Sequence, residues 1–376
     1  MAGIYLHIPF CKQACVYCDF HFSTSLKNKE ALVSALLREA ELRQDFIGDT
    51  TVNSIYFGGG TPSLLSAPEL QKIIGGLQQL FNLNPQAEIT LEANPDDLKP
   101  AYLDALAQTP VNRLSIGLQS FRPQDLRFMN RAHSAQESLQ SIKQAQTAGF
   151  TNLTIDLIYG LPNYPVSAWR DALKQVQDLG VPHFSAYALT VEPKTALLYQ
   201  IEKGKLPPLD EALAAQHFKA LQNFTEKTDY VHYELSSISL RGFEAKHNAS
   251  YWQGVPYLGL GPSAHSYKKG HRSWNVRNNN QYLKSLEKNK LPLQQESLSL
   301  ADEYNERIMT QLRLAKGLNV NTLEKDFGPN YSQYALQQAQ KLIQSGQFIQ
   351  EGNQLKIAAS QRFYSDGLAA ELFWVN

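Results

Sequence analysis

All three cysteines of this 376-residue chain lie in the stretch Tyr5-Leu-His-Ile-Pro-Phe-Cys11-Lys-Gln-Ala-Cys15-Val-Tyr-Cys18. The short apolar run from Ile4 to Ile8 predicts a strand, so the C-x3-C-x2-C spacing is expected in the loop that follows it. Three thiolates on one tight loop can ligate three irons of a 4Fe–4S cluster. The fourth iron would have no cysteine, so its ligand would be a small molecule or a side chain without sulfur.

A structural zinc site is the alternative for the same loop. Cys11, Cys15 and Cys18 would form a closed Cys3His set together with His21. A disulfide framework is disfavoured, because the cysteine count is odd and the chain is large enough to form a substantial core. The loop alone leaves both the cluster and the zinc site open.

The composition indicates a globular protein with balanced charge. Lys and Arg number 35, Asp and Glu number 35, and hydrophobic residues make up 43%. This balance disfavours nucleic acid as a partner. The chain shows no signal-peptide pattern at its start and no run of about 18 apolar residues. We therefore expect a cytoplasmic protein.

Six strand patterns alternate with helical patterns in the first half of the chain, at residues 4–8, 54–57, 89–92, 113–117, 153–158 and 184–189. This alternation predicts parallel βαβ units and an α/β fold. We expect a partial (β/α)6 barrel of the TIM type over residues 1–235, with an open doubly wound sheet as the alternative. In such barrels the functional residues gather on the loops at the carboxyl ends of the strands.

Several glycine and polar residues lie at or near the carboxyl ends of the predicted strands. The loop Gly58-Gly-Gly-Thr-Pro62 comes after the second strand pattern, Glu92 ends the third, Gln119 follows the fourth and Asp156 lies in the fifth. Together with Arg131, they offer acceptors for ribose hydroxyls and a donor for a carboxylate. Each could instead be a solvated rim residue, and the glycine loop could be a simple tight turn. As a set, they suit an amino-acid-bearing nucleoside.

The remainder of the chain divides into two parts. Residues 236–300 predict a loop-rich connecting region. Residues 301–376 predict helices followed by a hairpin with its turn at Gly352-Asn353, a winged-helix-like domain. Acidic residues outnumber basic ones from Glu296 to Asn376, which disfavours DNA as its partner.

The connecting region contains the stretch His247-Asn248-Ala-Ser-Tyr251-Trp252. His247 could ligate the iron of a macrocycle on which Tyr251 and Trp252 stack. The alternative is an aromatic anchor that packs a loop onto the barrel, with His247 hydrogen-bonded, and the residues alone favour this alternative.

Four motifs together resemble the radical S-adenosylmethionine (SAM) superfamily, and within it the relatives of anaerobic coproporphyrinogen III oxidase. They are the cysteine motif with Tyr17, the Gly-Gly-Gly-Thr-Pro loop, Glu92-Ala-Asn-Pro95 and Leu157-Ile-Tyr-Gly-Leu-Pro162. The resemblance covers nearly the whole chain. It implies that the fourth iron binds the amine and carboxylate of SAM and that an electron from the cluster releases a 5′-deoxyadenosyl radical.

By matching motifs, the resemblance implies a set of SAM-contacting positions, which are Tyr5, Gly59, Gly60, Thr61, Glu92, Gln119, Arg131 and Asp156. Tyr17 matches the aromatic residue between the second and third cysteines. The resemblance also disfavours zinc, because a closed structural zinc site needs no ligand-shaped rim.

Within that family the chain resembles the haem chaperones more than the oxidases. Phe20 stands where the oxidases carry a further cysteine, and His247-Asn-x-x-Tyr-Trp252 matches a haem-binding signature. The resemblance thus implies haem contacts by His247, Asn248, Tyr251 and Trp252. It implies an electron donor and haem-accepting respiratory proteins at the membrane surface as partners. Oxidative decarboxylation of coproporphyrinogen III is the alternative function, and no catalytic residue is assigned.

Overall fold

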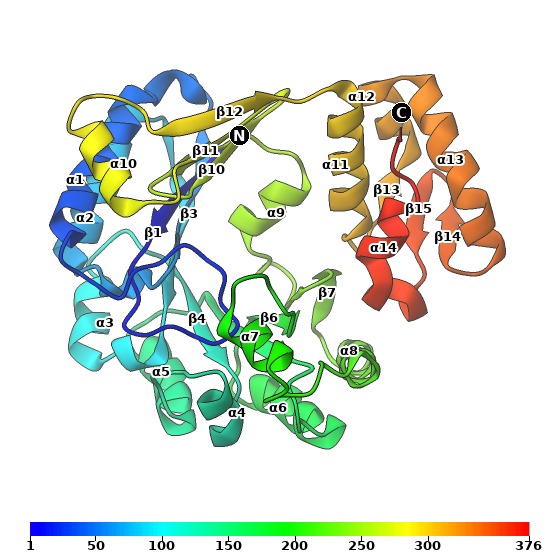
Figure 1. The fold of residues 1–376 in the computed structure, drawn as a ribbon, viewed down its shortest axis with the longest axis horizontal. Coiled ribbons are helices and arrows are strands. Elements are labelled where there is room, and N and C mark those ends of the chain that lie inside the picture. Colours follow the sequence, from blue (N-terminus) through cyan, green and yellow to red (C-terminus); the bar gives the residue numbers. More distant parts are fainter. Residues whose placement is uncertain (376) are drawn as a thin grey trace.

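The computed structural model describes residues 1–375, and its larger part is built on a twelve-stranded sheet (Figure 1). The strand order is β12-β11-β10-β9-β1-β2-β3-β4-β5-β6-β8-β7. The six strands from β1 to β6 are parallel and neighbour one another in chain order. They are β1 (Ala2–Ile8), β2 (Val52–Gly59), β3 (Leu83–Ala93), β4 (Arg113–Gln119), β5 (Leu153–Tyr159) and β6 (His183–Ala188). The predicted α/β fold of parallel βαβ units is confirmed.

Helices connect these strands and bury one apolar face each. The helices up to residue 225 are α1 (Lys29–Leu42), α2 (Ala67–Leu80), α3 (Pro100–Leu106), α4 (Pro123–Phe128), α5 (Ala135–Thr147), α6 (Val166–Asp178), α7 (Ala196–Glu202) and α8 (Glu211–Thr225). Ser66 and Ser134 begin α2 and α5 with capping boxes, in which Glu69 and Glu137 accept the reciprocal hydrogen bonds. Leu70, Ile73, Ile74 and Leu77 of α2 are buried, as the helical period requires.

Residues 236–300 are more regular than the sequence predicted. Instead of a loop-rich region, they contain β8 (Ser237–Ser239), α9 (Lys246–Trp252), β9 (Tyr257–Leu260), β10 (His265–Lys268), β11 (His271–Asn275), α10 (Asn279–Leu286) and β12 (Leu293–Ser297). Strand β9 pairs in parallel with β1, and β10, β11 and β12 extend that edge in antiparallel fashion. At the other edge, β8 pairs with β6 and with β7 (Val231–Glu234). These strands are too short to show a clear alternation of apolar and polar residues in the sequence. Strand β9 also pairs with β1, which is distant in the chain, for example Tyr257 with Gly3.

The C-terminal part has its own core and a three-stranded sheet in the order β13-β15-β14. Its elements are α11 (Leu300–Leu312), β13 (Leu318–Asn319), α12 (Val320–Phe327), α13 (Pro329–Gln344), β14 (Phe348–Glu351), β15 (Gln354–Ile357) and α14 (Ser365–Ala370). The expected helices and the hairpin are present, with Gly352 in the left-handed region (φ 58°).

The C-terminal part lies beside α9 and α8 (Figure 1): α11 contacts α9, and the short helical segment Ala359–Tyr364 contacts α8. Arg272 of β11 pairs with Glu306 of α11, and Gln311 Nε2 donates to the Trp252 carbonyl oxygen at 2.5 Å. None of the helices in the described chain has the length and apolar run that a bilayer crossing requires.

Candidate functional site

A cavity of about 720 Å³ lies where the parallel strands end and the cysteine loop begins. It is lined by most of the residues that the sequence singled out, namely Cys11, Cys15, Tyr17, Cys18, Gly59, Gly60, Thr61, Glu92, Gln119, Arg131 and Asp156. These residues come from the loops and ends of five neighbouring strands. The structure therefore brings them together at the edge where a parallel barrel carries its functional groups.

Hydrogen bonds to neighbouring segments hold the cysteine loop in place. The Cys11 amide donates to the Ser23 carbonyl oxygen at 3.0 Å, and the Ser23 amide donates to the Pro9 carbonyl oxygen at 2.8 Å. From the side of α4, Asn130 Nδ2 donates to the Ala14 carbonyl oxygen at 2.7 Å. Both ends and the middle of the loop are thus tied down by protein contacts.

The arrangement of side chains fits an iron–sulfur cluster better than a zinc ion. His21, the fourth ligand of the zinc alternative, directs Nε2 to Asn279 Oδ1 at 2.7 Å. In the part of the chain that the structure describes, no three His, Cys, Asp or Glu side chains converge to hold one ion. In a 4Fe–4S cluster each cysteine ligates a different iron, so three thiols need not converge on one point.

The three thiols are partly buried and have few polar partners. Burial raises the pKa of Cys11 and raises the pKa of Cys18 to about 11. Thr61 Oγ1 donates to Cys11 Sγ at 3.5 Å, and Arg131 Nη1 donates to Cys15 Sγ at 3.3 Å. Because burial disfavours the thiolate form of Cys11 and Cys18, a bound metal would be needed to keep these two groups deprotonated at neutral pH.

The glycines of the loop after β2 allow close approach of the segment that carries the cysteines. A Cβ atom on Gly60 would lie 2.6 Å from the Phe10 carbonyl oxygen and 2.8 Å from that of Ile8. Gly59 has φ +107°, and its Cβ would lie 2.7 Å from the His7 ring. The loop is therefore both a tight turn and part of the cavity wall. Its glycines pack against β1 and the residues that follow it, and Gly59 and Gly60 also line the cavity.

Two acidic side chains face the cavity. The Tyr56 hydroxyl donates to Glu92 Oε1 at 2.8 Å, and the Gly59 amide donates to Oε2 at 3.2 Å. Burial raises the pKa of Glu92 to about 7; the charge of Asp156 adds to this effect and the two hydrogen bonds oppose it. Burial also raises the pKa of Asp156, to which Ser115 Oγ donates at 3.4 Å. Both carboxyls could accept hydrogen bonds from ligand hydroxyls.

Arg131 spans the cavity wall between the cysteines and β4. Its Nη2 donates to Asn94 Oδ1 at 2.6 Å and to the Gly117 carbonyl oxygen at 2.8 Å. Gln119 sits in the left-handed region (φ 70°), which is uncommon for a residue with a side chain. The sequence reasoning did not assign roles to Asn94 or Tyr56, although Asn94 lies in a quoted motif and Tyr56 in a predicted strand.

Tyr5 and the stretch from His247 to Trp252 lie outside this cavity. Tyr5 lines a neighbouring pocket of about 290 Å³ together with His247, Asn248, Tyr251 and Trp252. The two cavities adjoin, because a set of residues lines both of them, namely Glu92, Tyr187, Ser236 and Arg313. Glu92 therefore lies between the two spaces, and Tyr5 lines only the smaller one.

His247 is fully buried and both of its ring nitrogens are hydrogen-bonded. Nδ1 lies 2.8 Å from Ser54 Oγ, and Nε2 lies 2.8 Å from the Tyr251 hydroxyl. Its ring stacks on Tyr56, with centroids 5.1 Å apart. Burial lowers the pKa of His247 to about 3. Both nitrogens are hydrogen-bonded here, as the packed alternative expects. The role of His247 as an iron ligand stays a prediction.

The partial barrel, with three thiols and a ring of polar groups at one end, has the features of a radical SAM protein. Residues 5–176 match the radical SAM superfamily, and residues 298–358 match the HemN C-terminal domain. The chain is 33% identical to the heme chaperone HemW of Lactococcus lactis subsp. lactis over 340 residues, 90% of this chain and 88% of that one. It is 31% identical to the heme chaperone HemW of Mycobacterium tuberculosis over 375 residues, 98% of this chain and 94% of that one. The chain belongs to the radical SAM superfamily and, within it, to the HemW family.

The fold has a counterpart among solved structures. Coproporphyrinogen III oxidase (HemN) from Escherichia coli matches with a TM-score of 0.85 at 22% identity, over 99% of this chain and 90% of that one. This likeness shows the shared fold of barrel and C-terminal part. Membership of the radical SAM superfamily implies a 4Fe–4S cluster and SAM.

Proposed function

We propose that this protein binds haem and delivers it to haemoproteins of the respiratory chain. The observation that carries the proposal is the extent of the likeness to the heme chaperones HemW, which spans 90% and 98% of this chain in two bacteria. The likeness includes the C-terminal part as well as the barrel. A shared cluster site alone would not require this, because the cysteines and the cavity lie largely within the barrel.

The cavity supports a cluster and SAM as resident cofactors. Cys11, Cys15 and Cys18 would hold three irons, and the fourth iron would bind the amine and carboxylate of SAM. When bound, the cluster supplies the electron that cleaves the carbon–sulfur bond of SAM. Arg131 would place a positive charge beside the cluster, since its guanidinium already contacts Cys15.

The protein's own acids and backbone would orient the nucleoside. Glu92 and Asp156 present buried carboxyls to the cavity, and Gly59, Gly60 and Thr61 form the adjoining wall. Gln119 and Tyr17 complete the set that we assign to cofactor binding. Tyr5 lines the neighbouring pocket together with Glu92, so it would affect SAM binding through Glu92.

Phe20 supports the chaperone over the oxidase. The resemblance implies a further cysteine at this position in the oxidases, whereas Phe20 here is 65% exposed and lines the cavity. A phenylalanine cannot ligate metal or exchange protons with a substrate. We therefore expect no decarboxylation of coproporphyrinogen III by this protein.

The remaining partners are part of the same proposal. An electron donor would reduce the cluster, and the haem acceptors would be respiratory proteins at the membrane surface. We propose a cytoplasmic location, because cysteines that ligate a cluster must not form disulfides, and a reducing compartment prevents this.

The test is a haem-transfer assay on the anaerobically reconstituted protein. Haem titration should produce a saturable Soret band, and added apomyoglobin should then take up the haem faster than haem is released in the absence of an acceptor. A protein that shows no saturable Soret band would contradict the proposal. Turnover of coproporphyrinogen III with SAM and dithionite would establish the oxidase instead.

A further inference from the structure

The chain that follows Cys18 is held by residues from a distant part of the sequence. Arg277 Nη2 donates to the Asp19 carbonyl oxygen. His21 Nε2 lies 2.7 Å from Asn279 Oδ1. Both partners belong to residues 277–280, which connect β11 to α10 and form the first residues of α10. We call these four residues the clamp segment.

The clamp segment contacts the second half of the cysteine loop, and other residues hold the first half. Lys12 pairs with Asp96, which follows β3, at 2.6 Å. The clamp segment bonds the chain beyond the last cysteine and extends as far as the start of α1, where Asn28 Nδ2 donates to Asn280 Oδ1 at 3.1 Å. The parallel strands therefore support one half of the loop, and the antiparallel edge of the sheet supports the other.

A buried carboxylate fixes the position of the clamp segment. Glu39 of α1 accepts hydrogen bonds from Asn275 Nδ2 at 2.8 Å and from the Tyr282 hydroxyl at 2.6 Å. Arg43 Nη1 pairs with the same carboxylate at 3.0 Å. Asn275 and Tyr282 precede and follow the clamp segment in the sequence, and both are buried. Because a buried donor without its acceptor is costly, these bonds restrict the movement of the clamp segment relative to α1.

The contacts of the clamp segment with the cysteine loop add little to the packing of the fold. Arg277 is exposed and Asn279 is half-buried, so neither side chain fills the core. Their partners instead lie directly after a cluster ligand, since Asp19 is the next residue after Cys18. Groups that bond the surroundings of a metal ligand orient that ligand and strengthen metal binding.

We propose that Arg277 and Asn279 are positioning residues for the iron–sulfur cluster, which hold Cys18 in place through Asp19 and His21. This inference rests on the cluster that we assign to the three cysteines, and it does not depend on haem delivery. The cysteines suffice to assemble the cluster, whereas the clamp segment slows its loss. The antiparallel edge of the sheet thereby acquires a role in retention of the cluster.

The first test measures how fast a chelator removes iron from the reconstituted protein. Arg277→Ala and Asn279→Ala should contain as much iron as the wild type after anaerobic reconstitution, because all three cysteines remain. Each variant should lose its iron to excess EDTA about three- to tenfold faster, because one hydrogen bond fewer makes local opening of the loop easier. Iron loss at the wild-type rate in both variants would overturn the proposal.

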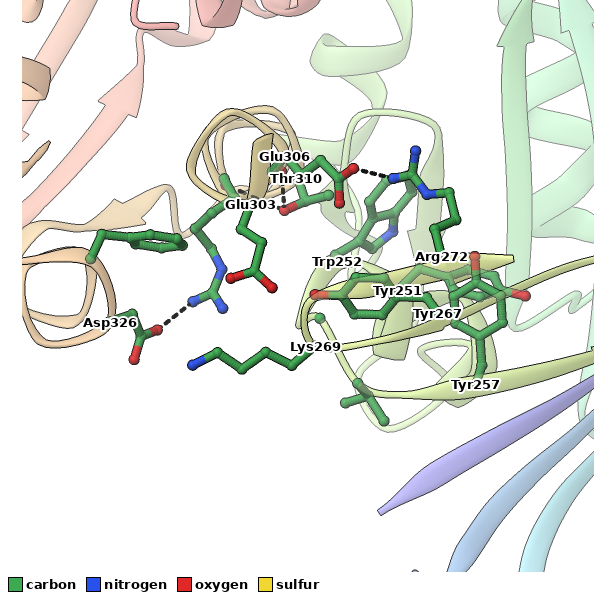
Figure 2. Close-up of a pocket in the computed structure, with 14 residues that line it drawn as sticks. Tyr251, Trp252, Tyr257, Tyr267, Lys269, Arg272, Glu303, Glu306, Thr310 and Asp326 are labelled. Carbon is green, nitrogen blue, oxygen red and sulfur yellow. Dashed lines mark hydrogen bonds and ion pairs between the residues drawn. The ribbon is translucent and has the colours of Figure 1, made fainter. Parts of the chain in front are cut away.

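Two further variants serve as controls. Arg272→Ala changes an arginine of the same edge that contacts the C-terminal part instead. Figure 2 shows Arg272 paired with Glu306 of α11, beside a cleft of about 550 Å³ between the barrel edge and the C-terminal part. This variant should lose iron at the wild-type rate, and faster loss equal to that of Arg277→Ala would contradict the proposal. Asn279→Asp keeps an oxygen acceptor for His21, so it should restore the wild-type rate.

Hydrogen exchange of the full chain without the cluster gives a readout that does not depend on iron. The amides of Cys18 and Ser23 donate to carbonyl oxygens in the fold, at 3.4 and 2.8 Å. In Arg277→Ala and Asn279→Ala these amides should exchange about three- to tenfold faster, while the amides of α2 exchange as in the wild type. Unchanged exchange, in a wild type that does assemble iron, would overturn this inference alone. A wild type that assembles no iron would overturn the cluster assignment and this inference with it.

Discussion

The Tyr56 hydroxyl donates a hydrogen bond to Glu92 Oε1 at 2.8 Å. The same Tyr56 ring stacks on His247, at 5.1 Å between centroids. One side chain of β2 therefore touches both the acid of the SAM cavity and the histidine of the neighbouring pocket. Tyr56 thus connects the SAM cavity directly with the neighbouring pocket.

Removal of the Tyr56 hydroxyl should shift the pH dependence of SAM binding. The pKa of Glu92 is about 7 because burial raises it, and the Tyr56 hydrogen bond opposes that rise. In Tyr56→Phe the pKa should rise further, so more Glu92 is neutral at pH 7 and accepts ribose hydroxyls less well. We expect SAM affinity about three- to tenfold weaker at pH 7, with recovery above pH 8, measured by calorimetry.

Tyr102→Phe provides the matched control for that experiment. Its hydroxyl donates to the Leu65 carbonyl oxygen at 3.0 Å, away from the cavity acids. The SAM titration of this variant should follow that of the wild type at every pH. An unshifted pH profile in Tyr56→Phe would mean that Glu92 does not control nucleoside binding.

Substitution of a single cysteine should remove the cluster. Cys11→Ala leaves two thiolates on the loop, which is too few to hold three irons, so the reconstituted protein should contain far fewer than about four irons. Iron and sulfide analysis measures this directly. His21→Ala should retain its iron, because His21 bonds Asn279 in the structure. Loss of bound zinc in both variants, with no iron in the wild type, would instead support the zinc site.

Arg131 should affect both the reduction potential of the cluster and the free energy of unfolding of the protein. Arg131→Met removes a donor to Cys15 Sγ and a nearby positive charge, so the reduction potential of the cluster should fall. It also leaves Asn94 Oδ1 and the Gly117 oxygen without this donor, at a cost of about 1–3 kcal/mol in the free energy of unfolding. A redox titration followed by electron paramagnetic resonance measures the first effect. Arg127→Met, at an exposed position of α4, should change neither quantity.

Gly60 and Gly75 should respond to alanine in opposite directions. A Cβ on Gly60 would overlap two backbone oxygens that cannot move freely, so Gly60→Ala should lower the free energy of unfolding by about 1–3 kcal/mol. Gly75 lies inside α2 with nothing within 4 Å of its Cβ, so Gly75→Ala should raise it by up to about 1 kcal/mol. Urea unfolding of both variants tests this. A neutral Gly60→Ala would show that the contact with the cysteine segment is loose.

His247 should make the protein less stable in acid. Burial lowers its pKa from 6.5 to about 3 in the folded state. Below pH 6.5 the imidazole of His247 gains a proton in the unfolded chain but not in the folded one. The free energy of unfolding is therefore highest above pH 6.5 as far as His247 is concerned, and it decreases as the pH falls toward 3. Between pH 6.5 and 5 the loss should be about 2 kcal/mol.

His247→Gln should reduce that pH dependence. Glutamine does not titrate and can still form hydrogen bonds with Ser54 and Tyr251. Urea unfolding of the cluster-free protein at pH 7 and pH 5 should therefore show a smaller difference for the variant. The same difference in both proteins would mean that His247 is protonated in the fold, and hence that it is less buried than the structure has it.

Local patterns accounted for the barrel and for most of the cavity. The strands from β1 to β6 and the alternation with helices were predicted because hydrophobic periodicity is read from neighbouring residues. Convergence of the cysteine loop, Glu92, Gln119 and Asp156 followed from one rule, that parallel strands end at the same edge. The contacts of Asn94 and Tyr56 could not be predicted in this way, because they join strands whose register is set only by the folded sheet.

The sequence by itself determined the cluster loop, the parallel barrel and the identity of the polar groups at its rim, because each depends on residues close together in the chain. Only the tertiary structure decided the hydrogen bonds of His247 and the shape of the pocket beside it. Ser54 and Tyr251, which bond the two nitrogens of His247, come from β2 and α9. The same pocket is lined by Tyr5 of β1, which is distant from α9 in the sequence. Such contacts depend on the packing of distant segments, and no local pattern encodes them.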